Sequence, residues 1–316
     1  MSETIGITGA TRLYAIIGDP IAQVRSPEVF TARFAAENVD ALLIPLHVPA
    51  ARFDEIAPAL LSLGNLDGVL ITIPFKVRIA RHASRLGAAA QCIGAANALR
   101  READGTWTGD MFDGVGFVRG AQRKGERVHG RRVALFGAGG AGSAIAYALA
   151  DAGAQSIAVV DVDAVKAETL AATLTAAFPA CSVAASARMP DRFDMVVNAS
   201  PVGMRPDDGL PAAIGPLDAG TLVGDVVIAG QPTALVRHAM QCGCPFVDGR
   251  DMHGGQVDAL LQFFASASSS MMARATCRSA RSRNAWRCRR AARIACSRRS
   301  WTWDGRKRMR RPGSIG

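Results

Sequence analysis

The sequence predicts an α/β fold with two domains, and three observations support that class. Apolar runs of strand length alternate with stretches of helical periodicity, a pattern typical of parallel sheets with helices on both faces. The alternation starts again after Asp113, which indicates a domain boundary near residues 115–130. A glycine-rich turn between a strand and a helix opens the second half. The chain of 316 residues is long enough for two ordinary domains.

The first half is expected to alternate strands and helices. A helix should start at Ser26-Pro27, because Ser is a favoured N-cap and Pro fits the first helical position. Asp104-Gly105 supplies the positive φ of a tight turn, so the segment around it indicates a β-hairpin. The strands are expected at residues 13–17, 42–48 and 69–73, and a second helix at 51–63.

The second half follows a polar connector, RKGERVHGRR, and repeats the alternation. A strand leads into the glycine-rich turn, and a helix follows it. Strands are expected at 133–136, 156–161, 195–198 and 222–227, and helices at 164–177, 233–242 and 252–264.

The formal net charge of +10 is concentrated at the C-terminal end. Residues 266–316 hold 15 of the 37 Lys and Arg but only one acid, Asp304, which leaves 22 basic and 26 acidic residues in 1–265. A nucleic-acid-binding domain is expected to carry a basic face on its folded part. The mildly acidic body therefore argues against nucleic-acid binding by the body.

Residues 266–316 are expected to form a disordered, Arg-rich tail. They show no sustained apolar period, so they cannot bury enough surface to offset chain entropy. A basic arm that binds RNA or a membrane would have this composition, and so would a frame-shifted or read-through terminus, which we favour. Deleting 266–316 is expected to leave activity and solubility intact.

Several other classes are not expected. No basic segment followed by an apolar run opens the chain, and no stretch suits a bilayer, so neither a signal peptide nor a membrane span is predicted. The seven cysteines form no paired CxxC framework, which favours the cytoplasm. Cys242 and Cys244 lack a His or acidic partner at ligand spacing, so no metal site is predicted.

The glycine-rich turn indicates a dinucleotide site. Gly137, Gly139, Gly140 and Gly142 lie in the run G-A-G-G-A-G directly after a predicted strand and at the start of a predicted helix. Such glycines permit a tight turn, let the backbone approach a pyrophosphate and allow close helix–strand packing. The helix N-terminus adds free N–H groups for phosphate oxygens.

Asp161 ends the next predicted strand, 19 residues after Gly142. A carboxylate there can bind the ribose 2′-hydroxyl and would repel a 2′-phosphate, so we expect NAD rather than NADP. Asp163 leaves an alternative open, because either aspartate could cap the following helix while the other binds the ribose.

Lys76 is a candidate for chemistry. Residues 1–265 hold 19 arginines but only three lysines, and of these Lys76 alone follows a predicted buried strand. Lys can lose a proton at accessible pH, whereas Arg essentially cannot. A helix-start lysine that points into solvent is the other interpretation.

Short motifs follow one another along residues 13–265. They are Gly18-Asp19-Pro20-Ile21 with Ser26-Pro27, Ile71 to Lys76, Gly94 to Asn97, Gly109 to Asp113, Gly137 to Gly142, Asn198-Ala199-Ser200 with Gly203-Met204, Asp225 with Thr233, and Gly249, Met252 and Gln256. Together, and in this order, they resemble the motifs of the shikimate/quinate dehydrogenase family.

The resemblance implies how the chain is divided. Residues 1–113 would form an N-terminal α/β substrate-binding and catalytic domain, completed by a returning helix at 249–265. Residues 114–248 would form a Rossmann-type NAD(P)-binding domain. Lys76 and Asp113 would be the catalytic pair, one of which accepts the hydroxyl proton while hydride leaves carbon. The charge of Lys76 stays open, because a neighbouring carboxylate and burial act in opposite directions.

The resemblance also implies binding residues. Thr72, Asn97 and Gln256 would hold substrate hydroxyls, and Ser26 would contact the substrate carboxylate. On the cofactor side, Asn198, Ser200 and Met204 would join the glycines.

The chain departs from the family pattern on the substrate side. Val24 lacks a hydroxyl that the family uses for the substrate carboxylate, and Arg25 could supply a charged substitute. Polar residues of the family pattern are also replaced by Leu70, Met111, Phe112 and Ile228. Each lost polar contact costs on the order of 1–3 kcal/mol in recognition, so weak or altered activity on shikimate is expected.

The resemblance therefore implies an oxidoreductase that transfers hydride between NAD(P) and a cyclic hydroxy acid, with shikimate and 3-dehydroshikimate first. The alternatives are an NAD-dependent quinate or related hydroxy-acid dehydrogenase, and a non-catalytic cofactor-binding relative, against which the Lys76–Asp113 pair argues. The expected partner is a small molecule, and a homodimer is an assembly open to the chain.

Overall fold

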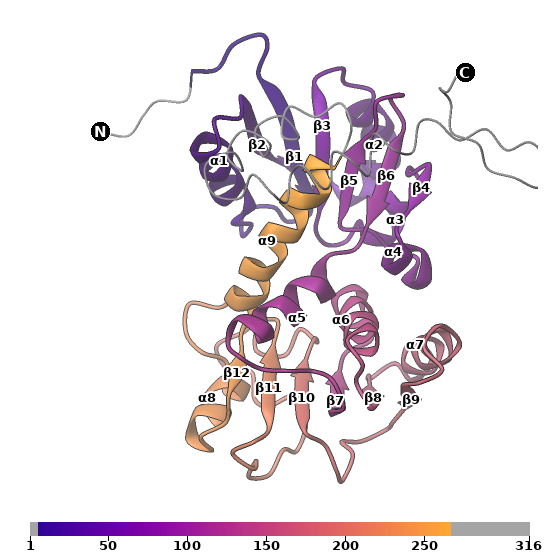
Figure 1. Ribbon diagram of the computed structural model, residues 1–316, viewed down its shortest axis with the longest axis vertical. Helices are drawn as coiled ribbons and strands as arrows, with labels where there is room; N and C mark the ends of the chain where they lie inside the picture. Colours follow the sequence, from indigo (N-terminus) through magenta and orange to yellow (C-terminus); the bar gives the residue numbers. More distant parts are fainter. Residues whose placement is uncertain (1–5, 267–316) are drawn as a thin grey trace, which may run out of the picture.

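The computed structural model describes residues 6–266, which form two six-stranded sheets connected by helices (Figure 1). The sheets lie one above the other along the long axis, and the α/β class predicted from the sequence is confirmed. The tail expected at 266–316 lies, apart from Ser266, outside the described residues.

The first sheet is built from the N-terminal strands in the order β2-β1-β3-β5-β6-β4. β1 pairs with β2 and β3 in parallel, whereas β5 runs antiparallel to both β3 and β6. The sheet is thus mixed rather than parallel throughout, because β5 and β6 form the predicted hairpin, with Gly105 at φ +84°. The strands are β1 Arg12–Gly18, β2 Ala41–His47, β3 Leu66–Ile71, β4 Arg85–Leu86, β5 Ala98–Arg101 and β6 Trp107–Asp110.

Helices cover both faces of this sheet. On one face, Phe53 of α2 stacks on Phe75, with ring centroids 4.5 Å apart. On the other, Phe264 of α9 packs against Tyr14 of β1 and Phe30 of α1. The helical segments of this half are α1 Ser26–Ala36, the 3₁₀ turn η1 Ala50–Arg52, α2 Phe53–Leu61, α3 Lys76–Ala80 and α4 Ala88–Ile93.

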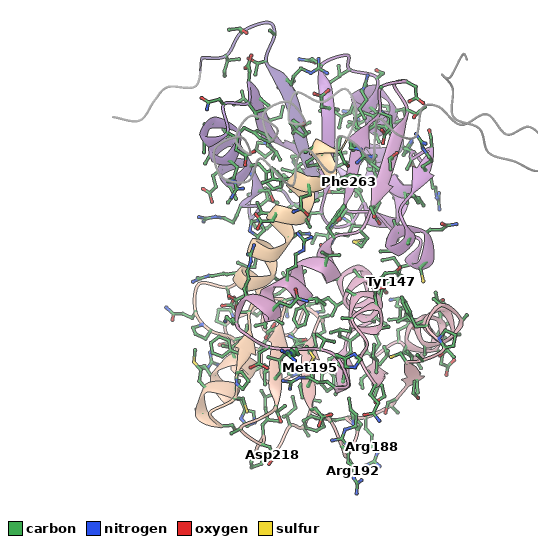
Figure 2. The ribbon with its side chains drawn as sticks, in the orientation of Figure 1. Tyr147, Arg188, Arg192, Met195, Asp218 and Phe263 are labelled. Carbon is green, nitrogen blue, oxygen red and sulfur yellow. The ribbon has the colours of Figure 1, made fainter. Side chains whose placement is uncertain are left out.

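The second sheet is parallel throughout, with the order β12-β11-β10-β7-β8-β9. This is the strand order of a dinucleotide-binding sheet, whose switch point lies between β7 and β10. The strands are β7 Arg132–Phe136, β8 Ser156–Val160, β9 Ser182–Ala185, β10 Met195–Asn198, β11 Leu222–Asp225 and β12 Phe246–Val247. Fully buried side chains such as Met195 fill its core, while Arg188 and Arg192 project at the end remote from the first sheet (Figure 2).

The remaining helices join the two sheets or cover the second. Figure 1 shows α5 and α6 between the sheets, and α9 running from the second sheet up to the first. Figure 2 labels Phe263 on α9. The ring centroid of Phe263 lies 5.0 Å from that of Phe112, which directly precedes α5. These helices are α5 Asp113–Arg123, α6 Gly140–Asp151, α7 Ala164–Ala177, α8 Ala234–Gln241 and α9 Gly249–Ala265.

The starts of two helices differ from the periodicity of the sequence. Ser26 is not the N-cap of α1, because Arg25 occupies that position and Ser26 is the first helical residue. The periodicity placed the start of α9 at residue 252, whereas the family resemblance gave a helix at 249–265; α9 begins at Gly249, because Asp248 and Asp251 form a capping box there.

Among residues 6–266, no helix is long and apolar enough to span a bilayer. The same residues contain no group of three or more His, Cys, Asp or Glu side chains arranged to hold a metal.

Candidate active site

Asp113 is the centre of a buried polar cluster. It is the first residue of α5 and is 4% exposed. Its Oδ1 accepts hydrogen bonds from Asn97 Nδ2 and Gln256 Nε2, each at 2.7 Å, and its Oδ2 accepts one from Lys76 Nζ at 2.5 Å. Three donors thus converge on one carboxylate.

Different elements supply these groups. Lys76 begins α3 after the loop that leaves β3, and Asn97 immediately precedes β5. Gln256 comes from the middle of α9, which returns to the first sheet. Asn97 also accepts a hydrogen bond from the Phe112 backbone N–H at 2.9 Å, which fixes the start of α5. The cluster therefore forms only when these four segments of the chain pack together.

The Lys76–Asp113 pair is shielded from solvent. The side chain of Lys76 is 17% exposed and that of Asp113 is 6% exposed. A lysine at a helix N-terminus is disfavoured by the helix dipole, so helix formation does not explain Lys76, whereas pairing with Asp113 does. A shielded amine and carboxylate in contact can hold or release a proton beside a reacting hydroxyl.

Thr72 directly follows β3 and precedes Lys76 by four residues. A Cβ on Gly18, at the end of β1, would come within 2.3 Å of Thr72 Cγ2, so the absence of a side chain at Gly18 makes room for Thr72. Thr72 is half-buried, and its backbone N–H donates to Ile17 O at 3.0 Å.

Ser26 and Arg25 have different surroundings. Ser26 is 9% exposed and its Oγ lies 3.5 Å from His253 Nε2. The Arg25 guanidinium is exposed and pairs with Glu28, so the structure does not bring Arg25 into the cluster around Asp113.

His253 was missed by the sequence reasoning. It is half-buried on α9, and burial, followed by the positive charge of Arg25, lowers its pKa below the usual value. The available signal was its position three residues before Gln256, because residues i and i+3 share a helix face.

The glycine turn has the shape that a dinucleotide needs. Gly137 follows β7 at φ +100°, in the left-handed region that favours glycine. A Cβ on Gly142 would lie 1.9 Å from Gly137 O, whereas one on Gly139 would have no neighbour within 4 Å. The turn is thus packed behind Gly142 and open at Gly139, so the residues present fit the pyrophosphate of a dinucleotide.

Replacing Gly142 and Gly139 with alanine should have different effects. Gly142→Ala is expected to lower the free energy of unfolding by about 1–3 kcal/mol, because its methyl group collides with backbone. Gly139→Ala is expected to fold normally but to weaken dinucleotide binding about tenfold or more, because its methyl group fills the open space. Urea unfolding and fluorescence titration with NADPH measure the two effects. Equal loss of stability in both variants would contradict the prediction.

The glycine turn lies next to Lys76. A Cβ on Gly140, the first residue of α6, would be 3.6 Å from Lys76 Cδ. The amine and the dinucleotide turn are therefore neighbours, although one follows a strand of the first sheet and the other a strand of the second.

Asp161 and Asp163, which follow β8, have different hydrogen-bonding roles. Asp161 accepts hydrogen bonds from the backbone N–H groups of Ala138 at 2.6 Å and Asp163 at 2.8 Å, so it holds the glycine turn. Asp163 is the N-cap of α7. A pocket beside them is lined by side chains that include Ala138, Ser143, Val165, Lys166 and Thr169.

Asn198 and Ser200 form a network of their own. Asn198 donates to Val202 O and to Asp225, and its Oδ1 accepts from the Ser200 hydroxyl at 2.7 Å. Burial raises the pKa of Asp225, although its bonds from Thr233, the Val227 backbone and Asn198 oppose that shift. Ser200 lies directly behind the glycine turn, because a Cβ on Gly137 would be 2.8 Å from Ser200 N. Met204, by contrast, is 64% exposed.

The doubly wound sheet, its glycine turn and the adjacent Lys–Asp pair define a dinucleotide-dependent oxidoreductase. Comparisons with known proteins narrow this class. A sequence model described as the shikimate dehydrogenase substrate binding domain matches residues 16–99, and one described as the ThiF family matches residues 117–182.

Relatives found by sequence, and proteins of known structure found by fold, agree with the match to the shikimate dehydrogenase model. Shikimate dehydrogenase (NADP(+)) of Rubrobacter xylanophilus is 34% identical over 253 residues, which cover 78% of this chain and 88% of the relative. The ligand-free 5-ketofructose reductase of Gluconobacter sp. strain CHM43 superposes with a TM-score of 0.74 at 28% identity, covering 84% and 97% of the two chains. Quinate dehydrogenase of Corynebacterium glutamicum, solved with NAD, gives 0.72 at 28% identity, with the same coverages. The chain belongs to the shikimate dehydrogenase family.

The expectation of NAD over NADP was wrong. The curated relatives, those of Rubrobacter and Bacillus among them, are named for NADP(+), although the Corynebacterium neighbour was solved with NAD. The expectation treated the Asp161 carboxylate as free for a ribose. In the structure both of its oxygens accept backbone N–H groups, so its presence is explained by the glycine turn itself.

Proposed function

We propose that this protein catalyses reversible hydride transfer between NADP(H) and a hydroxyl group of a cyclic hydroxy acid, with shikimate and 3-dehydroshikimate as the first pair to test. One observation carries the proposal. Asp113 receives hydrogen bonds from Lys76, Asn97 and Gln256, and Lys76 adjoins the glycine turn. Substrate and dinucleotide would therefore meet at Lys76.

The Lys76–Asp113 pair handles the proton in this proposal. In the oxidation direction the alcohol loses its O–H proton to the pair, the C–H bond breaks with its electron pair as hydride, and a ketone remains. A bound nicotinamide would accept that hydride. In the reverse direction the pair returns the proton to the oxygen. Burial of the pair keeps bulk water from competing for it.

The remaining residues of the site bind and orient. Asn97 and Gln256 each direct a side-chain amide at Asp113, so they would hold substrate hydroxyls beside the proton pair. Thr72 would add a hydroxyl from the end of β3, and Ser26 would contact the far end of the substrate. Gly137, Gly139, Gly140 and Gly142 would hold the pyrophosphate, with Asn198 and Ser200 supporting the turn from behind.

The presence of two separate sheets supports the assignment of substrate binding and dinucleotide binding to different parts of the chain. We assign substrate binding and catalysis to residues 1–113 with the returning helix 249–265, and dinucleotide binding to residues 114–248. The four cysteines among the described residues are free, which supports action in the reducing cytoplasm. A homodimer is the assembly we would test first.

Steady-state kinetics tests the proposal: the oxidation of shikimate and quinate is measured with NADP and with NAD, and the reduction of 5-ketofructose is measured with NADPH and with NADH. We expect NADP-dependent turnover of shikimate with a KM about tenfold or more above that of the Rubrobacter relative assayed beside it, because Val24 and Ile228 lack polar groups. Leu70, Met111 and Phe112 are buried in the hydrophobic cores, so their apolar side chains contribute packing. Turnover of neither shikimate nor quinate, including turnover of 5-ketofructose alone, would contradict the proposal.

A further inference from the structure

Two side chains face one another beside the Asp113 cluster. Ser26 Oγ, at the start of α1, and His253 Nε2, on α9, are 3.5 Å apart. A good hydrogen bond involving a hydroxyl is shorter, about 2.7–2.8 Å for oxygen partners. The contact is therefore long for a hydrogen bond, and both groups can donate to a ligand that lies beside the pair.

The position of His253 on α9 places it at the substrate. His253 and Gln256 are separated by three residues, so they lie on the same helix face with a rise of about 4.5 Å between them. Gln256 donates to Asp113, where the reacting hydroxyl would sit. His253 is thus one helical turn from the reacting group, a separation comparable with the width of a six-membered ring.

Packing of α9 does not account for His253. The helix approaches α5 through Gly255, where a Cβ would lie 2.2 Å from Gly116 O. Core contacts to the first sheet come from Val257, Leu260 and Phe264. His253 belongs to neither set and directs a polar nitrogen toward Ser26 instead.

The surroundings of His253 leave its ring able to donate to an anion. Burial is the main cause that lowers the pKa of His253; Arg25, the N-cap of α1, lowers it further, and Glu28 of α1, which pairs with Arg25, opposes the shift. A neutral imidazole keeps one N–H donor, and the Ser26 hydroxyl supplies a second.

We infer that His253, together with Ser26, binds the carboxylate of the substrate and determines specificity for an acid. This inference rests on the proposed function and deepens it. The imidazole N–H would donate to one carboxylate oxygen and the Ser26 hydroxyl to the other. Val24, two residues before Ser26, has no hydroxyl to offer, so His253 supplies a donor that the neighbouring segment of the chain lacks.

The test compares an acid with its neutral ester. Shikimate and methyl shikimate are assayed with wild type, His253→Leu and His253→Gln, whose amide nitrogen can take the place of Nε2. For His253→Leu we expect KM for shikimate to rise about tenfold or more, with kcat nearly unchanged and KM for the ester unchanged. His253→Gln should recover most of the preference for the acid. His129→Leu, an exposed histidine outside the site, is the matched control.

The outcomes distinguish failure of the inference about His253 from failure of the proposed function. Equal losses on acid and ester in His253→Leu would overturn the inference, because a structural role would affect both substrates alike. An unchanged acid-to-ester ratio in both variants would overturn it as well. If wild type turned over neither shikimate nor the ester, the proposed function would fail for this substrate, and the inference with it. An active wild type with an unaltered His253→Leu refutes the inference alone.

Discussion

Replacing Lys76 with alanine is expected to lower kcat about a thousandfold or more while NADPH binding stays within about twofold. The amine donates to Asp113 and adjoins the glycine turn, but the turn holds its shape through its own backbone and through Asp161. Proton transfer is therefore lost and the dinucleotide site is retained. Single-turnover absorbance of the reduced nicotinamide measures the first effect, and fluorescence titration measures the second.

Two further variants serve as controls for the Lys76→Ala experiment. Lys76→Met keeps the aliphatic stem and should be as inactive as Lys76→Ala, which separates the role of the amine from that of packing. Arg81→Ala removes an exposed cation just after α3 and should leave kcat near wild type. A kcat for Lys76→Ala within about tenfold of wild type would contradict the assignment of proton transfer to this amine.

Replacing Asp113 with asparagine is expected to affect both activity and stability. Both carboxylate oxygens accept N–H donors, so either orientation of the amide places its NH₂ group against a donor. We expect kcat to fall about a hundredfold or more, and the free energy of unfolding to fall by about 3 kcal/mol, because a shielded ion pair loses one partner. Steady-state kinetics and urea unfolding measure the two changes.

Asp151→Asn provides the control for the Asp113 variant. Asp151 is exposed at the end of α6, so its replacement should change the free energy of unfolding by no more than about 0.5 kcal/mol. If Asp113→Asn were as stable and as active as Asp151→Asn, the central place of Asp113 in the cluster would be refuted.

The sequence predicted best those elements whose formation depends on the residues of the element itself. α7 and β10 have the predicted bounds, because a helix of four turns and an apolar strand depend mainly on their own residues. The glycine turn lies between β7 and α6 as predicted. The short elements β4, α3, α4, β9 and β12 were not predicted, because two to six residues carry too little periodicity.

In the candidate site, too, residues in recognisable motifs were predicted, whereas contacts that arise only on folding were not. Lys76, Asn97, Asp113 and Gln256 were named from ordered motifs, and the structure brings them together. His253 was missed because its partner Ser26 is 227 residues away, a proximity that no local pattern contains. Asp161 was misjudged for the opposite reason, since its spacing suggested a ribose contact while its hydrogen bonds to Ala138 and Asp163 arise only in the folded turn.

We propose that the Lys76–Asp113 pair serves hydride transfer from a cyclic hydroxy acid to a nicotinamide. The most direct test supplies wild type with NADP and shikimate that carries deuterium on the carbon of the reacting hydroxyl. Mass spectrometry of the reduced cofactor should then show one deuterium for each ketone formed, and Lys76→Ala should yield neither product. Ketone formed without deuterium in the cofactor, or a wild type that forms no ketone, would refute hydride transfer from this acid at the Lys76–Asp113 pair.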